Sequence, residues 1–153
     1  MARVLVAGVG NIFFGDDGFG VEVARRLAAE RLPANVEVVD AGIAGVHLAF
    51  RLLDGYDLVI AVDAIARGDA PGTVYVLEPS LDEAPARADA HSVDLPAVFA
   101  MVRAMGGTLG RVVVVGCEPA EIEERMGLSA VAMAAVEPAM RRVRQIAEGA
   151  VEP

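Results

Sequence analysis

The sequence predicts an α/β protein with three layers, in which helices cover both faces of a five-stranded, mostly parallel sheet. Strand and helix patterns alternate along the 153 residues in the order β-α-β-α-β-β-α-β-α, which is typical of this class. The third strand pattern, at 57–63, has a continuous apolar centre, as expected for a parallel strand covered on both faces. The length fits a single domain, 1–153, and no internal repeat or linker is visible.

The first half of the chain contains three strand patterns and two helix patterns. The stretch 3–7 is a short β-branched run closed by Gly8. In 18–32 apolar residues recur every three or four positions and charged residues take the opposite face, which predicts an amphipathic helix. The second strand is expected to end at Asp40. The predicted elements are strands at 3–7, 36–39 and 57–63 and helices at 18–32 and 44–53.

The second half begins with a turn at 70–73 and a fourth strand at 74–78. No helix separates this strand from the third, so we expect it to run antiparallel at an edge of the sheet. The Pro- and Ala-rich stretch 79–90 is predicted to be a loop, and 111–116 a fifth strand.

Two further helices are predicted in this half. The helix at 91–105 is expected to be capped by Ser92 or Asp94, with Pro96 in its first turn. The helix at 129–147 is expected to start at Ser129, and Pro138 to kink or split it.

Composition and charge exclude several classes of protein. The formal net charge of −9 argues against a nucleic acid or an anionic membrane surface as a partner, because both repel an acidic body. A single cysteine excludes a disulfide scaffold and favours a reducing compartment. There is neither a secretory leader pattern nor an apolar run long enough to span a bilayer. We therefore expect a soluble, cytoplasmic protein.

The glycine-rich stretch 8–20, GVGNIFFGDDGFG, lies between a predicted strand and a predicted helix. Such turns often bind phosphate. Gly8 and Gly10 fit the first two positions of a dinucleotide fingerprint, but Phe13 stands where the third glycine belongs, and Asp40 could mimic the ribose-binding acid. Two adjacent aspartates at this helix start would repel a pyrophosphate. A nucleotide-binding protein therefore remains an alternative with an incomplete motif.

Three acidic or basic side chains are candidates for chemistry. Asp16 is interpreted as an ordinary helix N-cap, which leaves Asp17 without a structural explanation. Asp63 ends the third strand, next to the predicted end of the first, where α/β folds bind ligands. His91 follows a long loop at the start of a helix, whereas His47 is interpreted as a surface or packing residue. Asp17, Asp63 and His91 together would suit Ni²⁺, Zn²⁺ or Mn²⁺; separately, Asp63 could be a turn former and His91 a solvated loop residue.

Covalent catalysis has no visible support in the sequence. Cys117 ends the fifth strand without a basic residue close in sequence to activate it, so we interpret it as a small buried apolar residue. The G-x-S-x-G, phosphate-loop lysine and C-x-x-C signatures are also absent.

The motifs match one family specifically. The stretch 8–27, GVGNIFFGDDGFGVEVARRL, resembles the N-terminal signature of the hydrogenase maturation endopeptidases, although Phe13 stands where leucine is usual. The resemblance covers nearly the whole chain. It continues through VVDAGIAG at 38–45, DLVIAVDAIARGDAPGTV at 57–74, HSVDL at 91–95 and VVVVGCEP at 112–119.

This resemblance implies a twisted sheet between helices and a specific reaction. The family cuts a C-terminal extension from the large subunit of nickel-iron hydrogenases. Its metal-contacting residues fall on Asp17, Asp63 and His91, which would contact nickel already inserted in the precursor and so check its loading. Nickel, or another divalent ion in its place, would be borne by the substrate and could polarise the scissile carbonyl or a water.

The resemblance also assigns the residues around the cleft. The family's further aspartate falls on Asp40, a candidate general base or positioning residue, and Gly42 and Gly45 would shape a cleft loop. The expected catalytic residues are thus Asp17, Asp40 and Asp63, acting without a covalent intermediate. The expected partner is the large-subunit precursor, and the protein is expected to be a monomer. A catalytically inactive chaperone of the nickel-loaded precursor is a second alternative.

Overall fold

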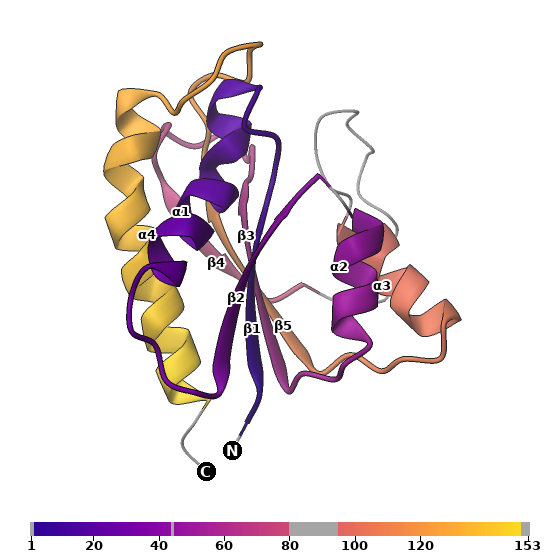
Figure 1. Ribbon diagram of the computed structural model, residues 1–153. Helices are drawn as coiled ribbons and strands as arrows, with labels where there is room; N and C mark the ends of the chain where they lie inside the picture. Colours follow the sequence, from indigo (N-terminus) through magenta and orange to yellow (C-terminus); the bar gives the residue numbers. More distant parts are fainter. Residues whose placement is uncertain (1, 44, 80–94, 151–153) are drawn as a thin grey trace.

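The computed structural model describes residues 2–43, 45–79 and 95–150, and it confirms the predicted α/β class. A five-stranded sheet in the order β2-β1-β3-β5-β4 is covered by helices on both faces (Figure 1). No helix in this described part is long and apolar enough to cross a membrane. The elements in chain order are β1 (Val4–Val9), the 3-10 turn η1 (Gly15–Gly18), α1 (Phe19–Ala28), β2 (Val36–Gly42), α2 (Gly45–Leu52), β3 (Leu58–Ala64), β4 (Val74–Leu77), α3 (Leu95–Ala104), β5 (Arg111–Cys117) and α4 (Ala130–Gly149).

The strand pairing brings the described candidate residues Asp17, Asp40 and Asp63 to the end of the sheet where the parallel strands finish. Strands β1, β2, β3 and β5 are parallel, and β4 pairs antiparallel with β5 at the edge, as predicted. Gly8 of β1 is aligned with Asp40 of β2 on one side and with Val62 of β3 on the other. The C-terminal ends of β1 and β3 therefore lie side by side, at the top of the view in Figure 1.

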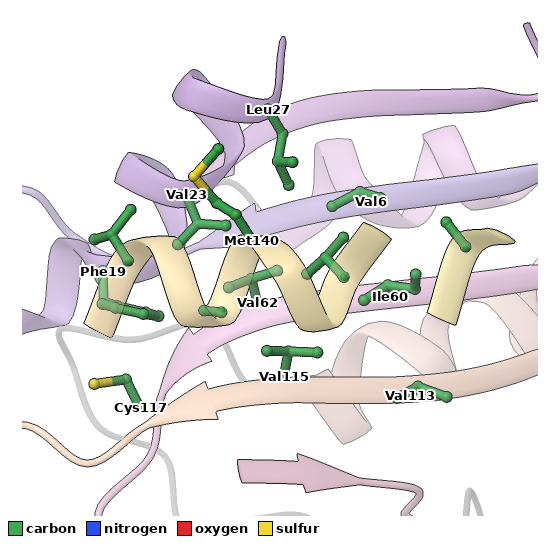
Figure 2. Packing of buried hydrophobic residues seen from close by; sticks show 14 of the residues in the cluster. Val6, Phe19, Val23, Leu27, Ile60, Val62, Val113, Val115, Cys117 and Met140 are labelled. Carbon is green, nitrogen blue, oxygen red and sulfur yellow. The ribbon is translucent and has the colours of Figure 1, made fainter. Parts of the chain in front are cut away.

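The two faces of the sheet carry separate apolar clusters. Even-numbered residues of β1 and β3, among them Val6 and Ile60, pack against α1 and α4 (Figure 2). Odd-numbered residues such as Leu5 and Val59 pack against α2 and α3. This alternation follows from the period of two of a strand. It also fixes the face to which each polar residue at a strand end belongs.

Helix α1 lies unusually close to the sheet because glycines meet at the contact. A Cβ atom on Gly20 would overlap the carbonyl oxygens of Val62 and Val9, and one on Gly8 would overlap the carbonyl of Gly20. Two glycines of the N-terminal motif thus serve helix–strand packing, one of the roles that such glycines have in phosphate-binding turns.

Several predicted boundaries change in the structure. The helix expected at 18–32 is shorter, since η1 takes Gly15–Gly18 and α1 ends at Ala28. The helix expected at 91–105 is described from Leu95, with Pro96 in its first turn. Its suggested caps Ser92 and Asp94, and nearly all of the loop predicted at 79–90, lie outside the described residues.

Helix α4 runs through Pro138 without interruption, so the predicted split at this proline is wrong. Proline removes one donor, which leaves the carbonyl of Ala134 without its usual partner. Both Pro138 and Ala134 are exposed, so water can hydrate that carbonyl. The predicted start is confirmed, because the side chain of Ser129 accepts a hydrogen bond from the amide of Ala132 at 3.3 Å.

Candidate active site

Asp17 lies in the turn that follows β1 and is almost completely buried. Its carboxylate accepts a hydrogen bond from the amide of Asn11 at 2.9 Å, which closes the loop back onto the end of the strand. Gly10 has a φ of 133° and Gly15 a φ of 57°, values that favour glycine. The glycine-rich turn thereby places an acidic side chain where a phosphate loop would present amides.

Asp63 is the penultimate residue of β3 and is also buried. As an odd-numbered residue of β3 it belongs to the face covered by α2 and α3. Its Oδ1 accepts a hydrogen bond from the amide of Ala64 at 2.8 Å. A Cβ atom placed on Gly10 would lie 3.8 Å from the same oxygen. The glycine-rich loop therefore borders this carboxylate directly.

The structure brings Asp17 and Asp63 together as an interacting pair of carboxylates. Burial, and next the negative charge of Asp17, raise the pKa of Asp63 well above its ordinary value. The repulsion between two buried carboxylates is reduced either by a proton on one of them or by a cation between them. Their oxygen donors fit a divalent cation.

The third predicted metal ligand, His91, lies outside the described residues. Among the residues that the structure describes, no group of three or more His, Cys, Asp or Glu side chains is arranged to hold a metal ion. Of the three expected ligands, only Asp17 and Asp63 lie in the described part of the chain, and the metal site stays a prediction.

Asp40 is not brought together with this pair. Val38 packs with the α1 and α4 cluster and Val39 with the α2 and α3 cluster, so Asp40 faces α1, on the opposite side of the sheet from Asp63. Its exposed carboxylate forms an ion pair with Arg25 of α1 at 3.6 Å.

Of the two glycines predicted to shape a cleft loop, Gly42 lies close to Asp40, whose Oδ1 is 3.7 Å from the Cβ position of Gly42. Gly42 ends β2 with a φ of 52°, and Gly45 is the first residue of α2. Asp40 and Gly42 both line a hollow of about 210 Å³. Gly45 is not among the residues that line it.

The interpretation of Asp16 as a helix N-cap is wrong. The N-cap of α1 is Gly18, without a side-chain hydrogen bond. Asp16 is fully buried and accepts hydrogen bonds from the amides of Ala120, Glu121 and Ser129 and from the Ser129 hydroxyl, at 2.7–3.2 Å. Burial by itself would raise the pKa of Asp16, but these hydrogen bonds together outweigh it and lower that pKa. Asp16 thus fixes the segment that precedes α4.

The sequence pattern does not single out Glu118, a further buried carboxylate at this edge. It accepts hydrogen bonds from the amides of Arg67 and Asp69 at 2.8 and 3.1 Å, and from the Tyr75 hydroxyl at 2.7 Å. The hydrogen bond from Tyr75, followed by those from the backbone, lowers the pKa of Glu118. Glu118 directly follows β5. This position after a strand is the sequence feature by which Glu118 could have been identified. It organises the loop between β3 and β4.

The interpretations of Cys117 and His47 are confirmed. Cys117 is buried and unpaired, and burial, followed by the charges of Asp16 and Glu118, raises the pKa of its thiol to about 11. A thiol in this state is a poor nucleophile. His47 is exposed on α2.

The fold and the site together define a class: an α/β protein that carries a buried acidic centre where parallel strands end, the usual ligand position of this architecture. The family model HycI, described as hydrogenase maturation protease, matches residues 21–146. The hydrogenase 2 maturation protease of Escherichia coli strain K12 is 33% identical over 146 residues, which cover 92% of this chain and 88% of that protein. The chain belongs to the hydrogenase maturation protease family and is a peptidase.

Other relatives and solved structures support the same family assignment. The hydrogenase expression/formation protein HupD of Rhodobacter capsulatus is 35% identical over 131 residues, and the match spans 82% of this chain but only 61% of HupD. The structure of the hydrogenase maturating endopeptidase HybD from E. coli superimposes with a TM-score of 0.85 and 30% identity, over 97% of this chain and 94% of HybD. None of these proteins supports the nucleotide-binding or chaperone alternative.

Proposed function

We propose that this peptidase removes the C-terminal extension of a nickel-iron hydrogenase large-subunit precursor once nickel has been inserted. The observation that carries the proposal is the buried pair formed by Asp17 and Asp63. Two like charges brought together away from water are costly unless a cation or a proton accompanies them. A pair of this kind is suited to test whether an incoming substrate carries a metal ion.

In this proposal the nickel arrives with the substrate. Asp17 and Asp63 supply two carboxylate ligands, and His91 supplies an imidazole. A precursor without nickel would meet an uncompensated negative pair and bind poorly. A bound divalent ion can supply Lewis acidity to a peptide carbonyl or to a water next to it.

The remaining chemistry is that of carboxyl groups. Hydrolysis of a peptide bond needs a base for the attacking water and an acid for the leaving amine. Burial and the charge of Asp17 raise the pKa of Asp63 while no cation is bound, and a carboxyl group that ligates nickel must be deprotonated. Asp63 would therefore release its proton when nickel binds, and its carboxylate would then be the candidate to accept a proton from the attacking water. Asp40 faces the other side of the sheet beside Arg25, so we assign it to positioning the substrate in the cleft.

The decisive experiment measures the mass of the host's large-subunit precursor after incubation with this protein, with nickel-loaded and nickel-free precursor side by side. We expect loss of a C-terminal peptide from the loaded form alone. Asp17→Asn, Asp63→Asn and His91→Ala should each reduce this processing by at least about a hundredfold, whereas Asp54→Asn, an exposed control, should retain it. Full processing by all three variants would refute the proposed ligands, and equal cleavage of nickel-free precursor would refute the role of nickel.

The assembly and the compartment follow from the same proposal. Asp17, Asp63 and His91 come from one chain, so the proposed site needs no second copy and we expect a monomer in light scattering. We also propose a cytoplasmic location, supported by the single buried thiol, and fractionation of the host cells would test it.

A further inference from the structure

Strand β2 forms one edge of the sheet, and among the described residues only β1 pairs with it. The amide of Val4 donates to the carbonyl of Asn35, so the odd-numbered residues of β2 direct their peptide groups towards β1 as far as the register shift between Asp40 and Gly42. In a parallel ladder the alternate residues point the other way. The peptide groups of Val38 and Asp40 therefore face outwards.

Two hollows lie on opposite sides of this edge and share Asp40. The larger, of about 400 Å³, lies on the α2 side and is lined by Ala41, His47 and Phe50. The smaller, of about 210 Å³, lies on the α1 side and is lined by residues that include Phe13, Arg25 and Ile43. Phe50 is 56% exposed and Phe13 57%. Each hollow thus has one exposed aromatic side chain.

This arrangement fits an added strand. Successive side chains of an extended peptide point to opposite faces of a sheet. A peptide paired with β2 would hydrogen-bond to the outward groups of Val38 and Asp40 and place alternate side chains in the two hollows, the mode known as β-strand addition. A segment of about four residues spans ~13 Å, enough to run from Val38 to Gly42.

The upper part of the β2 edge lies close to the acidic pair formed by Asp17 and Asp63. Gly10 lines the smaller hollow, and its amide donates to the carbonyl of Gly42 at 2.9 Å. The Cβ position of Gly10 is 3.8 Å from Oδ1 of Asp63. A chain lying along the upper part of β2 is therefore only one loop away from the carboxylates.

Charged side chains surround the lower part of the β2 edge and disfavour pairing with another strand there. Glu37 forms ion pairs with Arg3 at 3.2 Å and Arg51 at 2.8 Å. Charged residues on an edge strand are a common defence against pairing with another copy, and the net charge of −9 disfavours self-association further. These features favour a substrate segment as the occupant over a second copy of this chain.

We propose that the outer edge of β2, between Val38 and Gly42, binds an extended segment of the precursor next to its scissile bond by strand addition, with Phe13 and Phe50 as side-chain anchors. The inference rests on the proposed function, because it identifies how the same substrate is held. It makes β2 the specificity-determining strand and leaves the bond cleavage to the acidic pair.

Hydrogen exchange provides the direct test. The wild-type chain is saturated with a synthetic peptide that spans the scissile bond of the precursor, with saturation followed by fluorescence anisotropy. We expect slower exchange at the amides of Val38 and Asp40, and no change in β4 at the opposite edge of the sheet. A bound peptide that leaves β2 unprotected would overturn the proposal. So would protection that grows with protein concentration without peptide, since a second copy would then occupy the edge.

A kinetic test with the whole precursor applies if the isolated peptide binds too weakly to be studied by hydrogen exchange. With nickel-loaded precursor, the double variant Phe13→Ala/Phe50→Ala should raise KM by about tenfold or more and change kcat by less than about twofold. Val76→Ala is the matched control, because Val76 is an exposed apolar residue of β4, and it should leave KM unchanged. An unchanged KM in the double variant would refute the inference, whereas failure of the wild-type chain to cleave would refute the proposed function.

Discussion

Asp16 and Asp17 are consecutive residues of one 3-10 turn, yet their carboxylates bind to different parts of the molecule. Asp16 accepts hydrogen bonds from Ser129 and its neighbours ahead of α4. Asp17 accepts one from Asn11 and interacts with Asp63. The first carboxylate connects distant segments, and the second belongs to the acidic pair. The two adjacent acids of the motif therefore have separate roles.

The division of roles predicts opposite effects of substitution. Asp16→Ala would remove the charged acceptor of four hydrogen bonds, three from amides and one from the Ser129 hydroxyl, and we expect the free energy of unfolding to fall by about 3 kcal/mol or more. Asp17→Asn keeps an acceptor for Asn11 and removes a repulsive charge, so stability should stay equal or rise while processing is lost. Urea denaturation and the processing assay check both. A stable Asp16→Ala protein would contradict the structural role.

The buried carboxyl group of Asp63 should lower the free energy of unfolding at neutral pH. Burial and the charge of Asp17 raise its pKa, so the folded state holds a proton that the unfolded chain releases above pH 3.8. The free energy of unfolding therefore falls as the pH rises from 3.8 towards the raised pKa. Asp63→Asn removes this penalty, so its thermal midpoint should exceed that of the wild type at pH 7. The difference should vanish below pH 3.8, and a variant less stable at pH 7 would speak against this account.

Gly20 should tolerate no side chain. An added Cβ would overlap the backbone oxygens of Val9 and Val62, and neither strand can retreat from the sheet. We expect Gly20→Ala to lower the free energy of unfolding by about 3 kcal/mol, the upper range for overpacking. Gly149→Ala is the control, since nothing lies within 4 Å of its Cβ position at the end of α4. Equal denaturation midpoints for the two variants would disprove the close contact.

Glu37 should contribute stability that disappears in acid. Its hydrogen bond from Tyr56, and next that from Arg51, lower the pKa of Glu37 to about 2 from 4.5. A lowered carboxyl pKa stabilises the folded state above pH 4.5, and this contribution is lost as the pH falls to about 2. Glu37→Gln should therefore unfold at lower temperature than the wild type at pH 7 and at the same temperature near pH 2. Glu124→Gln, an exposed control, should follow the wild type throughout.

Much of the fold could be predicted because its signals are local. The apolar run of β3 predicted a parallel strand buried on both faces, and the missing helix before β4 predicted its antiparallel direction. Neighbouring strand ends follow from that topology, so the approach of Asp63 to Asp17 was also within reach. Each of these predictions needs only a periodicity and a connection rule.

Other features depended on contacts between distant segments. Asp16 lies 113 residues from its partner Ser129. The prediction from neighbouring residues alone therefore made Asp16 a helix N-cap, which was wrong. Glu118 has the same kind of partner in the loop around Arg67. The continuity of α4 through Pro138 depends on which side of the helix faces water. No pattern within one element contains this information.

The sequence by itself determined the order of strands and helices, the family and the presence of acids at the strand ends, because periodicity, turn residues and a motif of adjacent residues are written along the chain. Only the tertiary structure decided which acid does what. Asp16 and Asp17 have the same chemistry and nearly the same position, and Asp40 and Asp63 both lie near the C-terminal end of a strand. Their roles differ because the pleat sends Asp40 and Asp63 to opposite faces, and because folding surrounds Asp16 with donors but pairs Asp17 with another carboxylate.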